Sequence, residues 1–186
     1  KRTDENDLPF FFNLMNHLND NEIKCPQVIK DKSNKLYNFI KDKPAVITSF
    51  LNGISIKKIA PKHCGELGEN LAKFHLASNK LEIKRDNTLG IKDLNKLVIE
   101  INKLNLKEYD NLISIINNEY DYLKDEIPFN LPSGIIHADL FPDNVFFIAD
   151  QLSGIIDFYF ACNDYYAYEL AICINAWCFE RNNEFN

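Results

Sequence analysis

The sequence predicts an α+β protein with a small lobe of strands and one helix and a larger lobe that is mainly helical. Three observations support this prediction. Short strand-like runs follow an early helix, a long middle stretch has apolar residues at helical spacing, and short strands return before a last helix. The 186 residues are enough for a domain with its own hydrophobic core.

The first helix is expected over residues 7–20, with Asn6 or Asp7 as its cap and Pro9 in its first turn. Its apolar side chains recur at helical spacing: Leu8, Phe11, Phe12, Met15 and Leu18. Strand-like runs follow at residues 26–29, 35–40 and 45–50, separated by turns at residues 31–34 and 41–44.

From Pro61 onward, apolar faces predict three helices. The faces are Cys64, Leu67, Leu71, Phe74 and His75, then Leu94 to Leu104, then Leu112 to Leu123. A satisfied, partly buried histidine is the favoured interpretation of His75, ahead of a catalytic one. After Pro132, strands are expected at residues 135–136, 145–148 and 154–158, with a turn at 150–153 and a final helix at 165–180.

Composition excludes several classes of protein. The formal net charge of -6 argues against a nucleic-acid binder, and no apolar run approaches the length of a membrane-spanning helix. We therefore expect a cytoplasmic protein with neither nucleic-acid nor membrane partners. The five cysteines are odd in number and contain no Cys-x-x-Cys pair, so free thiols are favoured over disulfides or a zinc site.

The residues that indicate chemistry lie in the run from His137 to Asn144 and at Asp157. Asp139 precedes Asn144 by five positions in a loop that follows an apolar strand, and Asp157 ends a later apolar run. Phosphoryl transfer from ATP uses such a set. Asp139 would orient the attacking hydroxyl and accept its proton, while Asn144 and Asp157 would supply hard oxygen ligands to Mg²⁺.

The alternative is a polar loop in which Asp139 or Asp143 merely caps a turn. A lone His-x-Asp would favour that interpretation, but here four residues fall at compatible spacing between strands. Asp143 is better explained as a turn cap. His137 is assigned to the catalytic loop as a brace that forms hydrogen bonds, ahead of a residue that transfers protons.

These motifs resemble the aminoglycoside phosphotransferase and choline kinase superfamily, whose fold is similar to that of protein kinases. Four stretches are similar to one of its families in particular, the kinase-fold bacterial homoserine kinases. They are residues 7–11, 43–47, 155–162 and 170–179, and the resemblance extends over nearly all of the chain. Glu169 departs from this family, which usually carries Asp there. The resemblance implies that this carboxylate supports the catalytic loop.

The family implies that ATP and L-homoserine react to give ADP and O-phospho-L-homoserine, a step toward threonine, with ATP and Mg²⁺ as cofactors. Residues of the interlobe hinge would bind adenine through their backbone: Thr48, Ser49, Phe50 and Leu51. An ordinary strand end is the alternative at these positions. On the last helix, Asn175 and Trp177 are assigned to the substrate side, although the spacing of Trp177 also suits a core residue.

The resemblance also implies the domain division. Residues 1–52 would form a partial N-terminal lobe with the hinge, and residues 53–186 a truncated helical C-terminal lobe with the catalytic and metal-binding loops. A phosphate-covering loop and a basic phosphate-binding residue do not fit before Asp7. We therefore expect an internal part of a longer protein, inactive and poorly stable in isolation although the parent protein is an active kinase.

Two alternatives remain open. One is another small-alcohol kinase of the superfamily, acting on choline, an aminoglycoside or methylthioribose. The last helix is only mildly acidic, which weakly favours a zwitterionic substrate over a cation. The other is a non-catalytic protein that keeps the fold for binding alone, which would be expected to lose Asp139 or a metal ligand. The sequence leaves the oligomeric state open.

Overall fold

A computed structural model of the chain describes residues 4–104, 106–128, 130–179 and 184–185. The chain divides into two compact units, residues 1–86 with 132–186 and residues 87–131. Each unit is described by itself. The predicted lobe boundary between residues 52 and 53 concerns a different division of the chain and stays a prediction.

Helix α1 (Leu8–Asp20) lies within the predicted range, and Pro9 occupies its first turn. Proline is tolerated there because the first N–H groups of a helix have no intrahelical partner. The helix buries seven apolar side chains: Leu8, Phe10, Phe11, Phe12, Leu14, Met15 and Leu18. An interior element with so many buried residues is held by tertiary packing more than by helix propensity.

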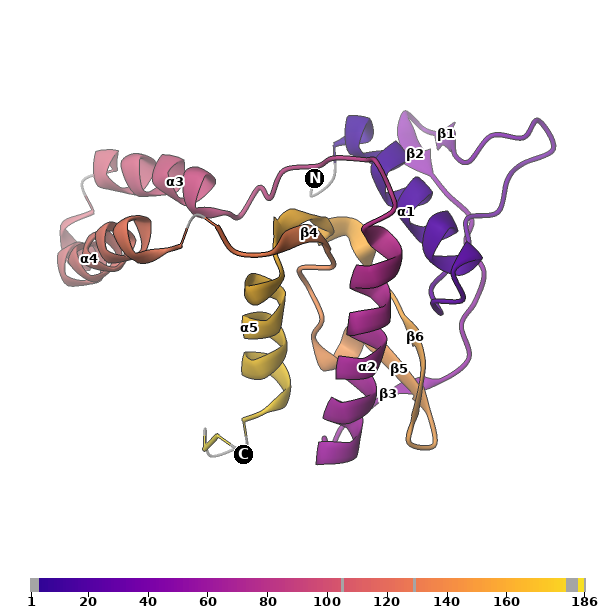
Figure 1. Cartoon of the computed structure of the whole chain (residues 1–186). Helices are drawn as coiled ribbons and strands as arrows, with labels where there is room; N and C mark the ends of the chain where they lie inside the picture. The colour runs from indigo at the N-terminus through magenta and orange to yellow at the C-terminus, as the bar shows by residue number, and fades with distance from the viewer. Residues whose placement is uncertain (1–3, 105, 129, 180–183, 186) are drawn as a thin grey trace. The chain divides into compact units, whose positions relative to one another are not determined.

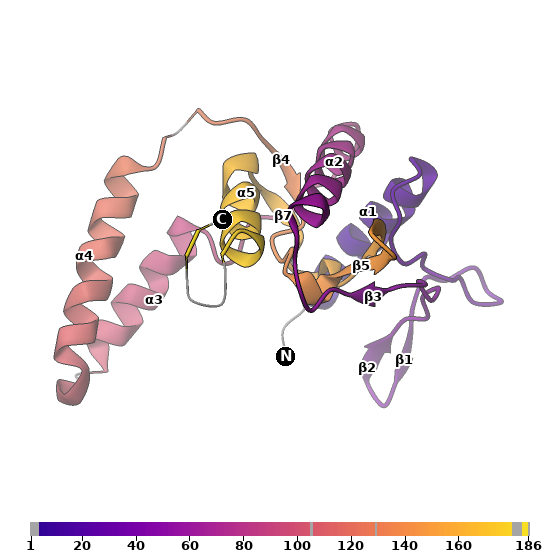
Figure 2. The same ribbon diagram turned by 90° about the horizontal axis from the view of Figure 1, so that it is seen from below.

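Strands β1 (Asn38–Ile40) and β2 (Lys43–Ala45) form an antiparallel ribbon at the edge of the first unit in Figure 2. Lys41 and Asp42 turn the chain with φ values of 50° and 58°. Two left-handed residues make a tight hairpin turn, so the second strand begins earlier than predicted. The predicted turn at 41–44 is therefore too long, and the strand predicted at 45–50 is wrong as a continuous strand.

On either side of the ribbon, residues 27–29 and 47–49 pair over a short stretch. Val28 and Thr48 form an isolated antiparallel bridge. Beside it, the Ile29 N–H donates to the Ile47 carbonyl at 2.9 Å, and the Ser49 N–H donates to the Gln27 carbonyl at 2.8 Å. The extended runs predicted near residues 28 and 48 thus meet as one short contact.

Helix α2 (Pro61–Ser78) lies alongside the β5–β6 hairpin in Figure 1 and contacts β6. The hairpin belongs to an antiparallel sheet of order β3-β5-β6, with strands Ile54–Ser55, Val145–Ile148 and Gln151–Ile155. The turn predicted at 150–153 is misplaced and too long, because the chain turns at residues 149–150, where Ala149 has a φ of 55°, and β6 already begins at Gln151. β3 was not predicted, since two residues carry no periodic signal.

Strand β4 (Ser133–Ile136) pairs antiparallel with β7 (Cys162–Tyr165), and helix α5 (Tyr166–Trp177) follows directly. The sequence did not predict β7, whose Cys-Asn-Asp-Tyr composition lacks apolar alternation. The predicted last helix reached residue 180, which lies outside the described residues. One core cluster contains buried side chains from α1, α2, β5 and α5, among them Phe11, Phe74, Phe147 and Trp177.

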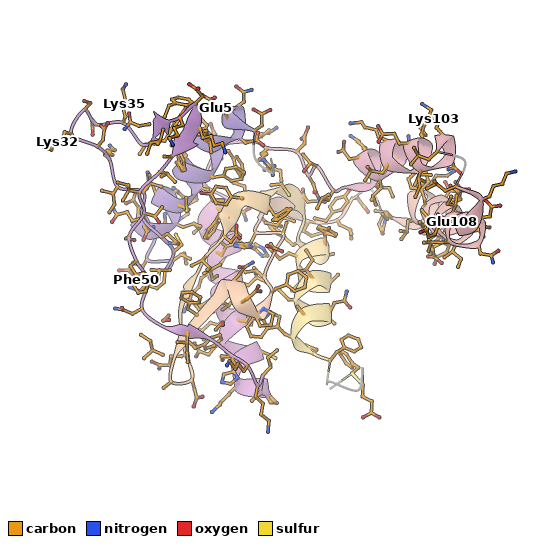
Figure 3. The ribbon with its side chains drawn as sticks, turned by 180° about the vertical axis from the view of Figure 1, so that it is seen from behind. Glu5, Lys32, Lys35, Phe50, Lys103 and Glu108 are labelled. Carbon is orange, nitrogen blue, oxygen red and sulfur yellow. The ribbon has the colours of Figure 1, made fainter. Side chains whose placement is uncertain are left out.

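The second unit consists of helices α3 (Ile91–Lys103) and α4 (Asp110–Glu126), which contact each other. Both were predicted from apolar spacing. Figure 3 labels Lys103 and Glu108 near the connection between them. The amide side chains of Asn102 and Asn117 exchange two hydrogen bonds, of 2.8 and 3.1 Å. Within the described ranges, no helix is long and apolar enough to cross a membrane.

Candidate functional site

Two loops of the first unit, here called the site loops, carry the predicted chemical residues. The first is residues 137–144, which leaves β4 and ends in a 3-10 turn at Pro142–Asn144. The second is residues 156–161, which leaves β6. The β5–β6 hairpin brings them together, because the Ile156 N–H donates to the Asn144 carbonyl at 2.9 Å.

Asp139 and Asn144 are in direct contact. The Asn144 Nδ2 donates to the Asp139 carbonyl at 2.8 Å and to its Oδ2 at 2.9 Å. This arrangement directs the Asn144 amide nitrogen at Asp139, so the Asn144 oxygen, Oδ1, is not used in the contact between the two residues. Mg²⁺ prefers oxygen ligands, and the donor type and orientation of Asn144 therefore suit a metal ligand.

Asp157 follows β6 in the left-handed region, with φ 62° and ψ 61°, and its side chain is exposed. A non-glycine residue held there costs about 1–3 kcal/mol and persists only where the surroundings impose it. Partial burial raises the pKa of Asp139, and the negative charge of Asp157 raises it further, while the Asn144 hydrogen bond acts in the opposite direction. The two carboxylates are thus electrostatically coupled, as expected for neighbours in one site.

His137 braces the two site loops. Its Nε2 lies 2.9 Å from the Ile156 carbonyl, which can only accept, so Nε2 carries the hydrogen. The ring also packs edge-on against Phe158 at 4.7 Å. Burial lowers the pKa of His137, so the ring stays neutral, and its buried Nδ1 has no partner within the described structure. These contacts agree with the bracing role expected for His137.

Glu169 of α5 holds the start of the first site loop. Its carboxylate is fully buried and accepts the backbone N–H groups of His137 at 2.7 Å and Ala138 at 2.8 Å. His75 of α2 lies 3.3 Å from the same carboxylate. Ala138 has a φ of 62°, a strained value for alanine. The expectation that Glu169 supports this loop is confirmed, and its longer side chain reaches both N–H groups.

Trp177, which the sequence assigned to the substrate side, is buried in the core. Its indole Nε1–H donates to the Leu140 carbonyl at 2.7 Å, so it ties the end of α5 to the first site loop. This packing fits the alternative of a core residue. Asn175 is exposed on α5. The substrate contacts of both residues stay predictions.

The predicted hinge, residues 48–51, belongs to the same unit as the site loops and makes a separate set of contacts. Ser49 uses its Oγ to accept the Gln27 N–H at 2.9 Å. The Phe50 side chain, which Figure 3 labels, is 88% exposed. Thr48 makes the bridge to Val28, and Leu51 packs close to Gly154. The nucleotide contacts of these four residues stay predictions.

Sequence reasoning missed Arg85. Its side chain is 9% exposed and contacts both α1 and the second site loop. A possible signal was that Arg85 is the only arginine between Arg2 and Arg181, in a chain where lysine otherwise supplies the positive charge. Its residue type suits several simultaneous hydrogen bonds, which one ammonium group cannot make in a plane.

The comparison with protein families decides the classification. The model described as "Phosphotransferase enzyme family" matches residues 1–186. The chain belongs to this phosphotransferase family. Membership agrees with the superfamily that the motifs at Asp139, Asn144 and Asp157 indicated.

Within the phosphotransferase family, curated relatives named homoserine kinase are similar to the whole chain. The chain is 48% identical to the one from Parvibaculum lavamentivorans and 47% identical to the one from Agrobacterium fabrum, each over 187 residues. It spans 58% of the length of each of these relatives. The predicted resemblance to homoserine kinases is confirmed.

Solved structures show the fold. An aminoglycoside-3'-phosphotransferase of type VIII matches with a TM-score of 0.67 at 16% identity, covering 96% of this chain and 67% of that chain. An amicoumacin kinase matches with a TM-score of 0.70 at 12% identity, covering 93% and 54%. The predicted α+β fold of the kinase type is thereby confirmed, and identities this low show the fold alone.

Proposed function

We propose that the protein that carries this chain transfers a phosphoryl group from ATP to the side-chain hydroxyl of L-homoserine, with Mg²⁺ as cofactor. The observation that supports this substrate is the 48% and 47% identity, along the whole chain, to two proteins named homoserine kinase. These identities are far higher than the 16% identity to the aminoglycoside phosphotransferase and the 12% identity to the amicoumacin kinase. The reaction gives O-phospho-L-homoserine and would be a step toward threonine. Dependence on ATP supports a cytoplasmic reaction.

Asp139 is the proposed catalytic base. It would accept a hydrogen bond from the substrate hydroxyl and take its proton as the oxygen attacks phosphorus. Its partial burial raises the pKa, which makes the carboxylate a better proton acceptor than an exposed one. The two hydrogen bonds from Asn144 hold the carboxylate and its backbone in one orientation.

Asn144 and Asp157 are the proposed magnesium ligands. The Asn144 amide presents its oxygen away from Asp139, and the Asp157 carboxylate is exposed, so both can reach an ion. An amide and a carboxylate form a small protein ligand set, which suits an ion that keeps waters and substrate phosphates in its shell. An ion held by these two residues would supply positive charge to offset the negative charge of the transferred phosphoryl group.

Residues 48–51 are proposed to hold adenine and Asn175 to face the substrate. Phe50 is exposed, which leaves an aromatic surface for a ligand near the proposed hinge. Asn175 is exposed on the same helix that carries Glu169. For Trp177, contact with Leu140 supports an indirect role, in which the indole positions the first site loop.

The test is ADP release with Mg-ATP by the protein that carries this chain. L-homoserine is compared with choline, kanamycin and 5-methylthioribose, and the product is identified by ³¹P NMR. We expect turnover with homoserine alone. Asp139→Asn should lower kcat by about 10²- to 10⁴-fold, the usual contribution of a positioned base.

Asp143→Asn is the matched control, since it makes the same change at an exposed position of the same loop. It should stay close to wild type. Turnover with another alcohol would discard homoserine and keep the site. An Asp139→Asn variant as active as Asp143→Asn would remove the base assignment. Failure of all four acceptors in a folded protein that binds Mg-ATP would favour a binding-only protein.

A further inference from the structure

Arg85 lies in the segment between α2 and α3, yet its side chain is buried beside the second site loop. Its Nη1 donates to the Ala161 carbonyl at 2.9 Å and lies 3.5 Å from the Phe160 carbonyl. Both carbonyls follow Asp157 within four residues. The guanidinium therefore contacts the backbone of the loop that carries the proposed metal ligand.

The backbone of Arg85 is tied to the strand that follows this loop. Its N–H donates to Asn163 Oδ1 at 2.8 Å, and its carbonyl accepts the Asn163 N–H at 2.7 Å. Asn163 belongs to β7, which pairs with β4 and so reaches the first site loop as well. Arg85 consequently has little freedom at its backbone as well as at its side chain.

The other side of the guanidinium faces α1. Arg85 Nε donates to Asp7 Oδ2 at 2.7 Å, and the guanidinium lies 5.0 Å from the centre of the Phe11 ring. Phe11 is fully buried and packs edge-on against Tyr159 at 5.4 Å. The start of α1 is therefore joined to residues 159–161 through Arg85 and through the Phe11–Tyr159 contact.

This connection matters because the Asp157 side chain is exposed and its backbone is strained, with φ 62°. Its position must come from the chain on both sides of it. Before Asp157, Ile156 is held by His137 and Asn144. After Asp157, Phe158 is buried and Arg85 holds the carbonyls of residues 160 and 161.

We propose that Arg85 is a positioning residue for Asp157: by fixing residues 159–161 to α1, it holds the Asp157 carboxylate in the place where the metal binds. This inference rests on the proposed function, because it needs Asp157 to be a magnesium ligand. Arg85 would touch neither the metal nor the substrate. Its effect should therefore appear in the magnesium dependence of nucleotide binding, ahead of nucleotide binding itself.

Arg85→Lys separates this role from that of an ion pair that only stabilises the fold. Lysine keeps the positive charge and can pair with Asp7, but it lacks the planar fork that also reaches the Ala161 carbonyl. A purely structural ion pair would be largely restored by lysine. A positioning role would not be restored, because the loop after Asp157 would lose its hydrogen bond.

The experiment measures binding of a non-hydrolysable ATP analogue by calorimetry, in EDTA and over a Mg²⁺ series, using the protein that carries this chain. In Arg85→Lys we expect half-saturating Mg²⁺ to rise by about 10-fold, the lower end of the cost of losing a direct partner of a metal ligand, because Arg85 acts on Asp157 through residues 160 and 161. Affinity in EDTA should be unchanged. Lys62→Gln, which removes the exposed partner of Asp150, is the control and should match wild type.

Asp7→Asn is the second variant, in case Arg85→Lys does not fold. It keeps the guanidinium but removes its carboxylate partner, which belongs to the N-cap residue of α1. Half-saturating Mg²⁺ should rise, but by less than in Arg85→Lys. Wild-type magnesium dependence in the folded variants would overturn the proposal. So would a wild-type protein whose nucleotide binding ignores Mg²⁺, which would also remove Asp157 as a ligand. Magnesium-dependent binding without turnover of homoserine would refute only the substrate.

Discussion

The site loops and the α3–α4 pair are held by different kinds of contact. At the site loops, buried charged side chains reach far along the chain: Glu169 binds backbone groups 31 and 32 residues away, and Arg85 binds Asp7 at a separation of 78. In the α3–α4 pair, the described residues of both helices include none that is buried. Their ion pairs join residues three apart, as in Lys96–Asp93.

This difference shows which region of the molecule depends on single side chains for its geometry. Backbone groups of both site loops depend on distant side chains, Glu169 and Arg85, in a buried setting where an unmet hydrogen bond is costly. The ion pairs of α3 and α4 are local and solvent-accessible, so each should have a small effect. The comparison predicts large effects of single substitutions in the first region and small ones in the second.

The largest effect is expected at Glu169. In Glu169→Ala the N–H groups of His137 and Ala138 lose their acceptor inside the protein, and a cavity remains. We expect the free energy of unfolding to fall by about 3–5 kcal/mol, the range for breaking a buried charged contact. Urea unfolding of the protein that carries this chain measures the change.

Glu169→Asp is the matched control because it keeps the carboxylate and shortens the side chain by one methylene. It should lose clearly less stability than Glu169→Ala. A loss in Glu169→Ala no larger than that of an exposed substitution would break the comparison, since it would mean that the buried carboxylate contributes nothing special to the first site loop.

The sequence predicted the elements whose signal is local. Helices α1 to α4 were located because apolar residues recur along each of them. The ends of the strands were predicted less accurately, because left-handed residues make their turns tight. Lys41 and Asp42 form the β1–β2 turn, and Ala149 begins the β5–β6 turn. Strands β3 and β7 are too short or too polar to carry a pattern, and they form because their partners β5 and β4 are present.

The residues of the candidate site also differ in whether the sequence carries a local signal for them. Asp139 and Asn144 are five residues apart, and their spacing in the sequence already assigned both to one site. The support from Glu169 was found through family resemblance and has no local signal. Arg85 was missed because Asp7, Ala161 and Asn163 lie 76 to 78 residues from it, and no periodicity joins such positions.

A smaller effect is expected at a buried thiol of the first unit. Burial raises the pKa of Cys25 to about 12 from 9.0. Between these values the unfolded chain releases the proton and the folded chain keeps it, so the stabilising contribution is complete below about pH 9 and is lost as pH rises toward 12. From pH 9 to 10 this thiol should lower the free energy of unfolding by about 1 kcal/mol.

Cys25→Ala tests this, because its free energy of unfolding should fall less steeply over that pH interval than that of wild type. Other groups that titrate there, the lysines and tyrosines, remain in both proteins and cancel in the difference. Equal slopes in the two proteins would show that the Cys25 thiol ionises in the folded state. The α3–α4 pair contains no cysteine and cannot contribute.

The smallest effect is expected at Asn102, whose side chain exchanges hydrogen bonds with Asn117 between α3 and α4. Asn102 is exposed and both hydrogen bonds are open to solvent. Water therefore replaces the lost partner, and Asn102→Ala should cost about 0.5 kcal/mol, the lower end for a hydrogen bond. A double-mutant cycle with Asn117→Ala, by urea unfolding, isolates the pair from the change in helix propensity. A coupling free energy above about 2 kcal/mol, beyond the ordinary net value of such a bond, would contradict the comparison. The α3–α4 pair would then also depend on a single specific contact, and exposure alone would no longer distinguish it from the site loops.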